Sequence, residues 1–314
     1  EGKKSREMAE SGRFVTDGKE FLLPSRLAES MVSPNNEELA DWVELLPSTI
    51  CELVDRWSLE LDEPYEPGGA CSWVAPARRR DGTEVVLKVG FRHPEAEHEA
   101  EALYFWDGAG VVLLYESHRT EQTCALLLER CTPGTPLSQA CPEPEQDEII
   151  AAFLRRLWRI PTPGHSFRPL QTMCDQWADE MEQYFSLYPQ RLDPGLVREA
   201  LQIFHSFSGT GTHNVLLLTD LHADNVLAAQ REPWLVIDPK PYVGDPAYDV
   251  VQHMLNCLER LDTDPDRLAE RMADLTGVDA MRVKAWLFAR CVQEGLSGES
   301  WSEPLKEIAS RLTL

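Results

Sequence analysis

The chain is poor in positive charge, and this scarcity narrows the classes of partner that it can bind. Lysine and arginine together number 30, against 53 aspartate and glutamate residues, so the formal net charge is −23. Nucleic-acid binding requires basic patches that contact phosphate groups, and this composition argues against it. The charge is compatible with a cationic small-molecule substrate, and also with the ordinary acidity of many soluble proteins.

Long apolar runs and paired cysteine motifs are also missing. No apolar stretch approaches the roughly 20 residues that a helix needs to cross a membrane. Residues 1–6 are charged, with no apolar signal segment. The eight cysteines are scattered and contain no C-x-x-C pair. We therefore expect reduced thiols in a cytoplasmic protein, with no zinc site and no membrane partner.

The apolar patterns that are present predict an N-terminal arm followed by a small lobe. Residues 1–34 are polar and predict an irregular arm. Residues 35–131 predict an antiparallel β lobe with one helix, preceded by a helical stripe that Pro47 interrupts. An Asp81-Gly82 turn is expected to join two of its strands. The expected elements are strands at 71–79, 84–89, 111–115 and 123–128 and a helix at 94–108.

Residues 132–314 predict a larger, mainly helical lobe, and a hinge is expected at 131–136, where the two lobes join. Short strands between 215 and 238 interrupt the helical spacing of its apolar residues. Helices are expected near 149–158 and over 170–187, 194–208, 247–261, 265–275, 279–295 and 301–313. Together the two lobes predict an α+β fold of the two-lobed, protein-kinase-like class.

The residues that carry chemistry lie inside those short strands. Asp220 and Asn225 are five residues apart, and Asp238 follows the apolar run W-L-V-I eighteen residues after Asp220. This D-x-x-x-x-N…D spacing is typical of a phosphotransferase catalytic loop. Asp220 would accept the proton of an attacking hydroxyl. Asn225 and Asp238 would supply oxygen ligands to Mg²⁺ that bridges the phosphates of ATP.

Lys88, in the apolar strand V-V-L-K-V, is a candidate nucleotide-binding residue. In kinases a strand lysine contacts the α- and β-phosphates and is held by a helix glutamate. Glu97, Glu99 and Glu101 follow on the expected helix, and they cannot all share one face. Glu99 is the preferred partner and the other two are alternatives. A solvated surface pair is the common outcome for such residues, but their order upstream of the Asp220 loop favours the nucleotide role.

Gly68, Gly69 and Ser72 lie in P-G-G-A-C-S, within the segment from about 58 to 90 where strand periodicity is expected, and between the first two strands of that segment. Adjacent glycines let the backbone approach phosphate oxygens, and a serine hydroxyl adds a donor. No Lys-Ser/Thr follows, so the segment is not a Walker A loop. P-G-G often forms an ordinary turn, and only its position before the Lys88 strand predicts a phosphate-binding loop.

Three polar residues near the loop have structural interpretations. Asp245 precedes Pro246 and predicts a helix cap. Asp249 lies in the first turn of that helix and is expected to anchor backbone N–H groups of the catalytic loop. His222 is expected to be a loop histidine with satisfied hydrogen bonds. Neither a G-x-S-x-G elbow nor a second histidine at ligand spacing supports a hydrolase or a metal site.

With these residues the chain resembles the aminoglycoside phosphotransferase family, over about residues 40–300. Within it the similarity is to the aminoglycoside 6-phosphotransferases, or streptomycin 6-kinases, and to the hydroxyurea resistance kinases. The most specific stretch is 220–249, with I-D-P-K-P at 237–241 and G-D-P at 244–246, and residues 93–100 and 104–108 also match. Leu218 and Thr219 depart from the His or Trp usual before the aspartate, and Ala223-Asp224 replaces a small residue and glycine.

The resemblance implies an ATP- and Mg²⁺-dependent kinase that phosphorylates a hydroxyl of an aminoglycoside of the streptomycin type and so confers antibiotic resistance. It places the catalytic base at Asp220, the metal ligands at Asn225 and Asp238, and the ATP lysine with its partner at Lys88 and Glu99. It also implies that backbone groups between Glu129 and Cys131 bind adenine. Carboxylates that could receive a cationic acceptor are Asp175, Asp179, Glu180, Asp224 and Glu294.

Other functions remain open at this point. The acceptor could be an amino sugar, hydroxyurea or an unknown metabolite, since nothing in the sequence excludes these. A kinase-like binding protein without turnover is disfavoured by the intact set of Lys88, Asp220, Asn225 and Asp238. A protein kinase is disfavoured because no D-F-G or A-P-E segment is present. The sequence gives no indication of oligomeric state.

Overall fold

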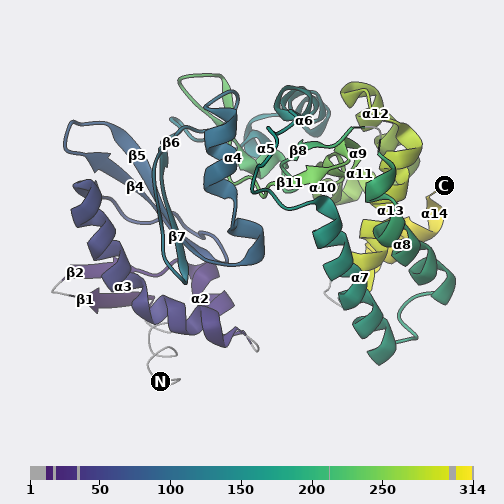
Figure 1. Ribbon diagram of the computed structural model, residues 1–314, viewed down its shortest axis with the longest axis horizontal. Coiled ribbons are helices and arrows are strands. Elements are labelled where there is room, and N and C mark those ends of the chain that lie inside the picture. Colours follow the sequence, from purple (N-terminus) through teal and green to yellow (C-terminus); the bar gives the residue numbers. More distant parts are fainter. Residues whose placement is uncertain (1–11, 17–18, 34–35, 212, 297–301, 313–314) are drawn as a thin grey trace. The chain divides into compact units, whose positions relative to one another are not determined.

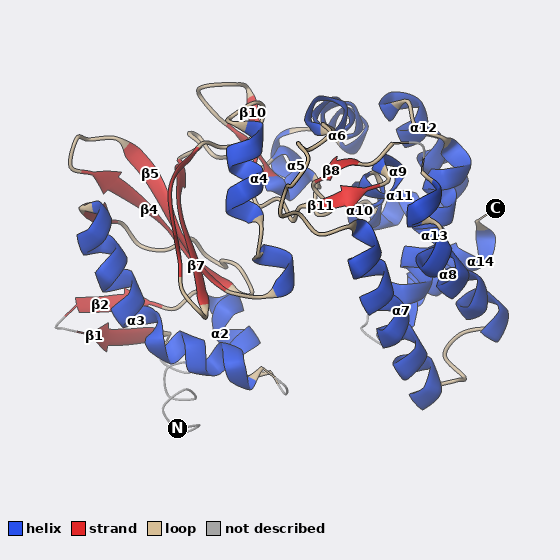
Figure 2. Ribbon diagram, viewed as in Figure 1, coloured by secondary structure: helices blue, strands red, loops and turns tan. Residues whose placement is uncertain are grey.

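The computed structural model describes residues 12–16, 19–33, 36–211, 213–296 and 302–312, which form two units (Figure 1). The first unit is Glu1–Thr132 and the second is Pro133–Leu314. A β-sheet forms the centre of the first unit, and helices make up most of the second (Figure 2).

Five antiparallel strands form the main sheet of the first unit, in the order β3-β4-β5-β7-β6. The predicted turn at Asp81-Gly82 joins β4 to β5, and the φ of 89° at Gly82 explains the glycine. β6 begins at Leu114 instead of 111, because the apolar pair at 111–112 is buried ahead of the strand. The strands span Leu59–Leu61 (β3), Ser72–Arg79 (β4), Glu84–Phe91 (β5), Leu114–Arg119 (β6) and Thr123–Glu129 (β7).

Alternation along β5 sends its side chains to opposite faces of the sheet. Val85, Leu87 and Val89 are fully buried in the hydrophobic core that the sheet shares with α3 (Glu37–Trp57). Lys88 points to the other face, where α4 (Glu99–Trp106) packs, and Figure 1 shows the two helices on opposite sides of the sheet. The alternation along this strand therefore places the core residues on one face of the sheet and Lys88, the candidate nucleotide-binding lysine, on the other.

The break predicted at Pro47 is wrong, because α3 continues through it. A proline inside a helix loses a backbone hydrogen bond and costs about 3 kcal/mol. α3 offsets this cost by burial, since Trp42, Leu46 and Ile50 are each no more than 1% exposed. Each large apolar side chain buried in this way contributes roughly 1.5–3 kcal/mol.

The N-terminal segment is not the irregular arm that its polarity predicted. Its described residues form the hairpin β1 (Arg13–Thr16) and β2 (Lys19–Leu22) and the helix α2 (Ser25–Met31), whereas 1–11, 17–18 and 34 lie outside the described residues. Leu27 and Met31 are buried in the core with α3. Leu23 and Ala28 of the same segment are buried with them, and the surrounding polar residues obscured this apolar face in the sequence.

The second unit contains the long helices predicted for it. One helix expected over 247–261 is instead three short ones, and the second division falls at Cys257, where the backbone leaves the helical region with ψ at 48°. A short helix, α5, was not predicted. The helices are α5 (Leu137–Ala140), α6 (Glu143–Leu157), α7 (Leu170–Leu187), α8 (Pro194–Ser206), α9 (Pro246–Asp249), α10 (Val251–Asn256), α11 (Leu258–Thr263), α12 (Pro265–Thr276), α13 (Ala280–Leu296) and α14 (Ser302–Arg311).

Two short antiparallel ladders lie among these helices. β8 (Val215–Leu217) pairs with β11 (Tyr242–Gly244), and β9 (Val226–Ala228) pairs with β10 (Trp234–Val236). In the sequence, β9 and β10 both lie between β8 and β11. As a result, the loop after β8 and the loop before β11 lie side by side, and these are the loops that contain Asp220 and Asp238.

Two observations bear on the expectations from composition. All eight cysteines are free thiols, and burial raises the pKa of Cys174, Cys257 and Cys291 to about 12. Within the described part of the chain, no helix is both long enough and apolar enough to cross a membrane.

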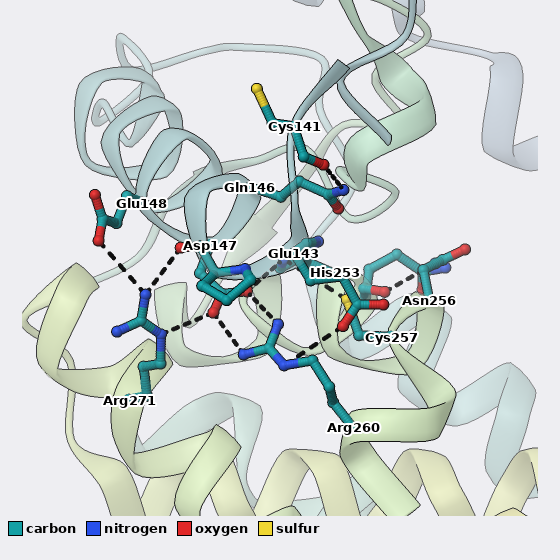
Figure 3. Close-up of polar contacts among 12 residues, drawn as sticks. Cys141, Glu143, Gln146, Asp147, Glu148, His253, Asn256, Cys257, Arg260 and Arg271 are labelled. Carbon is teal, nitrogen blue, oxygen red and sulfur yellow. Dashed lines mark hydrogen bonds and ion pairs between the residues drawn. The ribbon is translucent and has the colours of Figure 1, made fainter. Parts of the chain in front are cut away.

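A buried polar cluster joins four helices of the second unit (Figure 3). Asp147 of α6 is fully buried and accepts from His253 at 3.0 Å, from Arg260 at 2.7 and 3.1 Å and from the Arg271 Nε at 2.8 Å. Burial alone would raise the pKa of Asp147, but these three donors lower it well below its usual range. The carboxylate is therefore ionised, and it holds α10, α11 and α12 against α6.

We expect Asp147→Asn to lower the free energy of unfolding by about 3 kcal/mol, the lower end of the range for breaking a buried pair, since both arginines reach solvent. Denaturant unfolding at pH 7 measures this. The contribution should be present above pH ~4, where the unfolded carboxyl is ionised, and should be lost as the pH falls toward the depressed native pKa. Glu148→Gln is the matched control, because Glu148 is exposed on the same helix and contacts Arg271 only at 3.6 Å. Equal losses in the two variants would contradict this role.

Candidate active site

The backbone around Asp220 is held in one conformation by hydrogen bonds. The Asp220 N–H donates to Leu218 O at 2.7 Å, and the Asn225 Nδ2 donates to Asp220 O at 2.9 Å. Thr219 has φ at 50°, which is uncommon for a β-branched residue. The Asn225 side chain therefore closes the loop onto Asp220, and Asp220 lies at a strained turn directly after β8.

Asn225 and Asp238, the predicted metal ligands, flank the paired strands β9 and β10: Asn225 directly precedes β9, and Asp238 lies two residues after the end of β10. The Ile237 N–H donates to Asn225 O at 2.9 Å, so the residue after Ile237 lies beside Asn225. With its Nδ2 bound to Asp220 O, the Asn225 amide has its orientation fixed. An amide oxygen and a carboxylate are hard ligands of the kind Mg²⁺ takes, with phosphate and water completing the shell. Among the described residues no three His, Cys, Asp or Glu side chains are grouped to hold a metal ion by themselves.

Lys240 is a residue of this site that the sequence analysis did not single out. Its Nζ lies 3.0 Å from the Asp220 Oδ2. The I-D-P-K-P segment had been noted only as part of the family resemblance. The available signal was a lysine two residues after a candidate metal ligand, in the loop that leads into β11.

Asp249 anchors the catalytic loop, as predicted. Its carboxylate accepts from the Thr219 N–H at 2.6 Å, from the Leu218 N–H at 3.0 and 3.1 Å and from the Trp158 indole N–H at 3.0 Å. Burial raises the pKa of Asp249 to about 6, and these donors oppose that shift. Asp245 caps α9 by accepting from the Ala247 N–H, also as predicted.

In the first unit Lys88 forms an ion pair with Glu99, with Nζ 2.7 and 2.8 Å from the two carboxylate oxygens. The pair is largely buried, at 14% and 6% side-chain exposure. The two alternative glutamates have other partners: Glu97 contacts Arg92 at 3.0 Å and Glu101 contacts Arg119 at 3.4 Å. The lysine is thus pre-oriented, which reduces the entropy it would lose on binding phosphate.

The Gly68-Gly69 segment requires its glycines. Gly68 has φ at 76°, and a Cβ there would lie 2.6 Å from the Pro24 Cβ. A Cβ on Gly69 would lie 2.5 Å from the Ser72 Oγ. The Pro67 carbonyl also accepts from the Arg26 N–H at 3.0 Å, so the loop rests on the N-terminal helix α2. These contacts give the glycines a structural reason, and phosphate binding by the loop stays a prediction.

The remaining predicted residues occupy diverse places. Glu129 ends β7, and its side chain accepts from the Leu113 N–H at 3.0 Å. Cys131 follows as a half-buried free thiol. Among the acceptor candidates, Asp175, Asp179 and Glu180 lie along α7, where glutamines of the same helix donate to Asp175 and Glu180. Glu294 of α13 pairs with Arg290 at 2.7 Å.

Asp224 is the one acceptor candidate that lies in the catalytic loop. Its carboxylate accepts from the Ser138 hydroxyl and is 3.7 Å from the His222 Nδ1. The three residues line a cavity of about 310 Å³. His222 is not the satisfied histidine that was expected, because within the described chain its buried Nδ1 has no hydrogen-bond partner. Burial also lowers the pKa of His222.

Solved structures show that this fold is kinase-like. An amicoumacin kinase, solved with AMP-PNP, Ca²⁺ and amicoumacin, superposes with a TM-score of 0.56 at 12% identity, over 84% of this chain and 93% of that one. The fold class predicted from the sequence, two-lobed and protein-kinase-like, is therefore confirmed. The family model and the streptomycin 6-kinase relatives described next show the class of protein, a phosphotransferase that acts on a hydroxyl group.

The chain belongs to the aminoglycoside/hydroxyurea antibiotic resistance kinase family, whose sequence model matches residues 56–303. It is 32% identical to the streptomycin 6-kinase of Streptomyces griseus, over 87% of this chain and 90% of that protein. It is 30% identical to the hydroxyurea phosphotransferase of Kitasatospora aureofaciens, over 87% of this chain and 79% of that protein. The resemblance stated from the motifs is thereby confirmed.

We expect Asp249 to gain a proton as the pH falls through about 6. The protonated acid is a weaker acceptor, so the Leu218 and Thr219 N–H groups should exchange faster at pH 5 than at pH 7, after correction for intrinsic rates. This group's contribution to folding is greatest below pH ~4 and declines as the pH rises through 6, because its native pKa lies above the unfolded value. The faster exchange expected at pH 5 would therefore report a local opening, in which the loop moves away from Asp249 while the carboxyl group stays buried and the fold as a whole is not weakened.

Hydrogen exchange of a peptide covering 215–219 measures this opening, and a peptide from the buried strand β7 is the internal control. Unchanged protection of 215–219 between the two pH values would contradict the anchoring role.

Proposed function

We propose that this protein is an ATP- and Mg²⁺-dependent kinase that phosphorylates a hydroxyl of a streptomycin-type aminoglycoside. The observation that carries the proposal is the closed catalytic loop. In this loop the Asn225 side chain is bound to Asp220 O, and Asp249 accepts from the N–H groups of Leu218 and Thr219. This arrangement supports phosphoryl transfer, because a base and a metal ligand are aimed together.

Each residue has a distinct task in this proposal. Lys88, held by Glu99, contacts the α- and β-phosphates of the nucleotide. Asn225 and Asp238 hold Mg²⁺, which when bound neutralises charge on the phosphates. Asp220 accepts a hydrogen bond from the acceptor hydroxyl and takes its proton as the oxygen attacks phosphorus. The buried Lys88–Glu99 pair of the first unit and the hydrogen-bonded loop of the second unit each support side chains that are oriented before the substrates bind.

A cationic acceptor is supported by three independent facts. Two relatives at 32% and 31% identity are streptomycin 6-kinases. The chain carries a net charge of −23, which attracts cations over a distance. The cavity beside the catalytic loop is lined by Asp224 and Glu143, and the Asp224 side chain is 63% exposed. We therefore propose Asp224 as a contact for an amino or guanidino group of the acceptor.

Hydroxyurea is the second candidate acceptor, and the relative from Kitasatospora aureofaciens favours it. Hydroxyurea is small and uncharged, so the screening of charges by salt separates the two candidates. The KM for a polycation should rise with added NaCl, because screening acts over about 8–10 Å. The KM for hydroxyurea should stay constant.

Asp220→Asn should reduce turnover by about 10²–10⁴-fold, the usual loss when a general base is removed. Binding of the nucleotide, measured by calorimetry with a non-hydrolysable ATP analogue, should change little, since Asp220 is assigned to the acceptor. The assay transfers labelled phosphate from ATP to a panel of streptomycin, other aminoglycosides, amino sugars and hydroxyurea. A variant with near wild-type kcat would overturn the assignment of the base, and a panel without any labelled product would overturn the kinase proposal.

Asp224→Asn should raise the KM for streptomycin by about tenfold, the value of one charge-assisted hydrogen bond, with kcat little changed. It should also weaken the dependence of that KM on salt. Asp262→Asn is the matched control, because Asp262 is a half-exposed carboxylate on α11 that pairs with Arg311. If both variants have the same KM for streptomycin, Asp224 does not contact the acceptor.

A further inference from the structure

The ion pair between Lys240 and Asp220 places a positive charge on the proposed catalytic base. The Lys240 Nζ is 3.0 Å from the Asp220 Oδ2, and the two side chains are 31% and 20% exposed. A lysine ammonium has three N–H donors, so Lys240 can hold one oxygen of Asp220 and also contact a second anionic group beside it.

Backbone contacts fix the position of Lys240 relative to the catalytic loop. The Lys240 N–H donates to Leu218 O at 2.9 Å, and the Thr219 hydroxyl donates to Lys240 O at 2.5 Å. Prolines precede and follow Lys240 in the sequence, and each restricts the backbone at its own position and at the residue before it. The lysine is thus attached on both sides to the two residues that precede Asp220.

The residues next to this pair have unusual backbone conformations. Thr219, directly before Asp220, has φ at 50°, and Asp238, two residues before Lys240, has φ at 53°. Such conformations are unfavourable and persist where surrounding contacts enforce them, most often at functional sites. Here the enforced geometry places a base, an ammonium and a metal-ligand candidate within one pair of adjacent loops.

We propose that Lys240 is a further catalytic residue, whose ammonium contacts the phosphoryl group during transfer while it also holds one oxygen of Asp220. The inference rests on the proposed kinase function. With Oδ2 held by Lys240, Oδ1 of Asp220 is directed to the acceptor hydroxyl. The ammonium then lies beside the position where the acceptor oxygen meets phosphorus, and it neutralises charge on the phosphoryl oxygens.

The step balances without another reactant. The acceptor oxygen forms a bond to the γ-phosphorus, and the bond from that phosphorus to the β,γ-bridging oxygen breaks, with its electron pair leaving on ADP. The hydroxyl proton passes to Asp220 and then to solvent. Lys240 remains protonated throughout and forms no covalent bond. Its contribution is electrostatic, and it is greatest when charge spreads over the transferring group.

A binding measurement without turnover tests the contact directly. ADP with Mg²⁺ and aluminium fluoride mimics the planar phosphoryl group, and such mimics bind tighter than ground-state ligands when the site matches the transition state. We expect wild-type protein to bind ADP tighter with aluminium fluoride than without it. The ratio of the two ADP affinities, with and without aluminium fluoride, should fall in Lys240→Met and Lys240→Gln. The expected fall is about 10²-fold if the contact equals one oxyanion donor. Lys240→Arg should keep part of the ratio.

Lys306→Met is the matched control. Lys306 also forms one ion pair, with Glu303 at 2.6 Å, and lies on α14 outside the candidate site. Its ratio should equal that of the wild type. A wild-type ratio retained in both Lys240→Met and Lys240→Gln would overturn the role of Lys240 alone. A wild-type protein with no increase in affinity from aluminium fluoride would overturn the proposed function together with it.

Kinetics distinguish a contact with the phosphoryl group from an effect exerted only through Asp220. Lys240→Met should lower kcat by about 10²–10³-fold, with little change in the KM for either substrate. In the Asp220→Asn background it should lower the residual rate further, because the phosphoryl contact survives the loss of the base. If Asp220→Asn and the double variant have equal residual rates, Lys240 acts only through Asp220, and the proposed contact is refuted.

Discussion

The candidate active site depends on one buried carboxylate, that of Asp249. It accepts from two consecutive backbone N–H groups, those of Leu218 and Thr219, and from the Trp158 indole. Burying this charge is costly, as the pKa of about 6 indicates, and the N–H donors offset much of that cost. Any displacement of the loop would remove both backbone donors and leave, of these three, only the Trp158 indole. The same penalty that destabilises a buried charge therefore keeps the catalytic loop in one position.

From that anchor the remaining geometry follows in short steps. Leu218, once fixed, presents a carbonyl that accepts from both the Asp220 and the Lys240 N–H. The first contact turns the chain at Thr219, and the second joins the loop that carries Asp238 to the loop that carries Asp220. Asn225 closes back onto Asp220 O. Asp220, Asn225 and Lys240 therefore share one framework of hydrogen bonds.

Sequence spacing predicted the parts of the site that are local, and missed those that pairing creates. Asp220, Asn225 and Asp238 were found because a loop motif has a fixed spacing. Lys88 was found because it lies in a short apolar strand, with glutamates shortly after it and the Asp220 loop downstream. Lys240 was missed because its contact with Asp220 spans twenty residues and depends on the pairing of β8 with β11. The helix through Pro47 and the docked segment before residue 34 were missed for a related reason, since tertiary burial overrode a local signal.

The acceptor is the feature that the scaffold specifies least, and the structure shows why. The catalytic loop is fixed by backbone hydrogen bonds and one buried carboxylate, which many side-chain replacements nearby would leave intact. The cavity beside it is lined by side chains such as Ser138, His222 and Asp224, which take no part in the hydrogen bonds that Asp249 makes to Leu218 and Thr219. Relatives with a shared loop can therefore differ in acceptor through a few exposed side chains. This separation of chemistry from recognition fits a family that includes both streptomycin and hydroxyurea kinases.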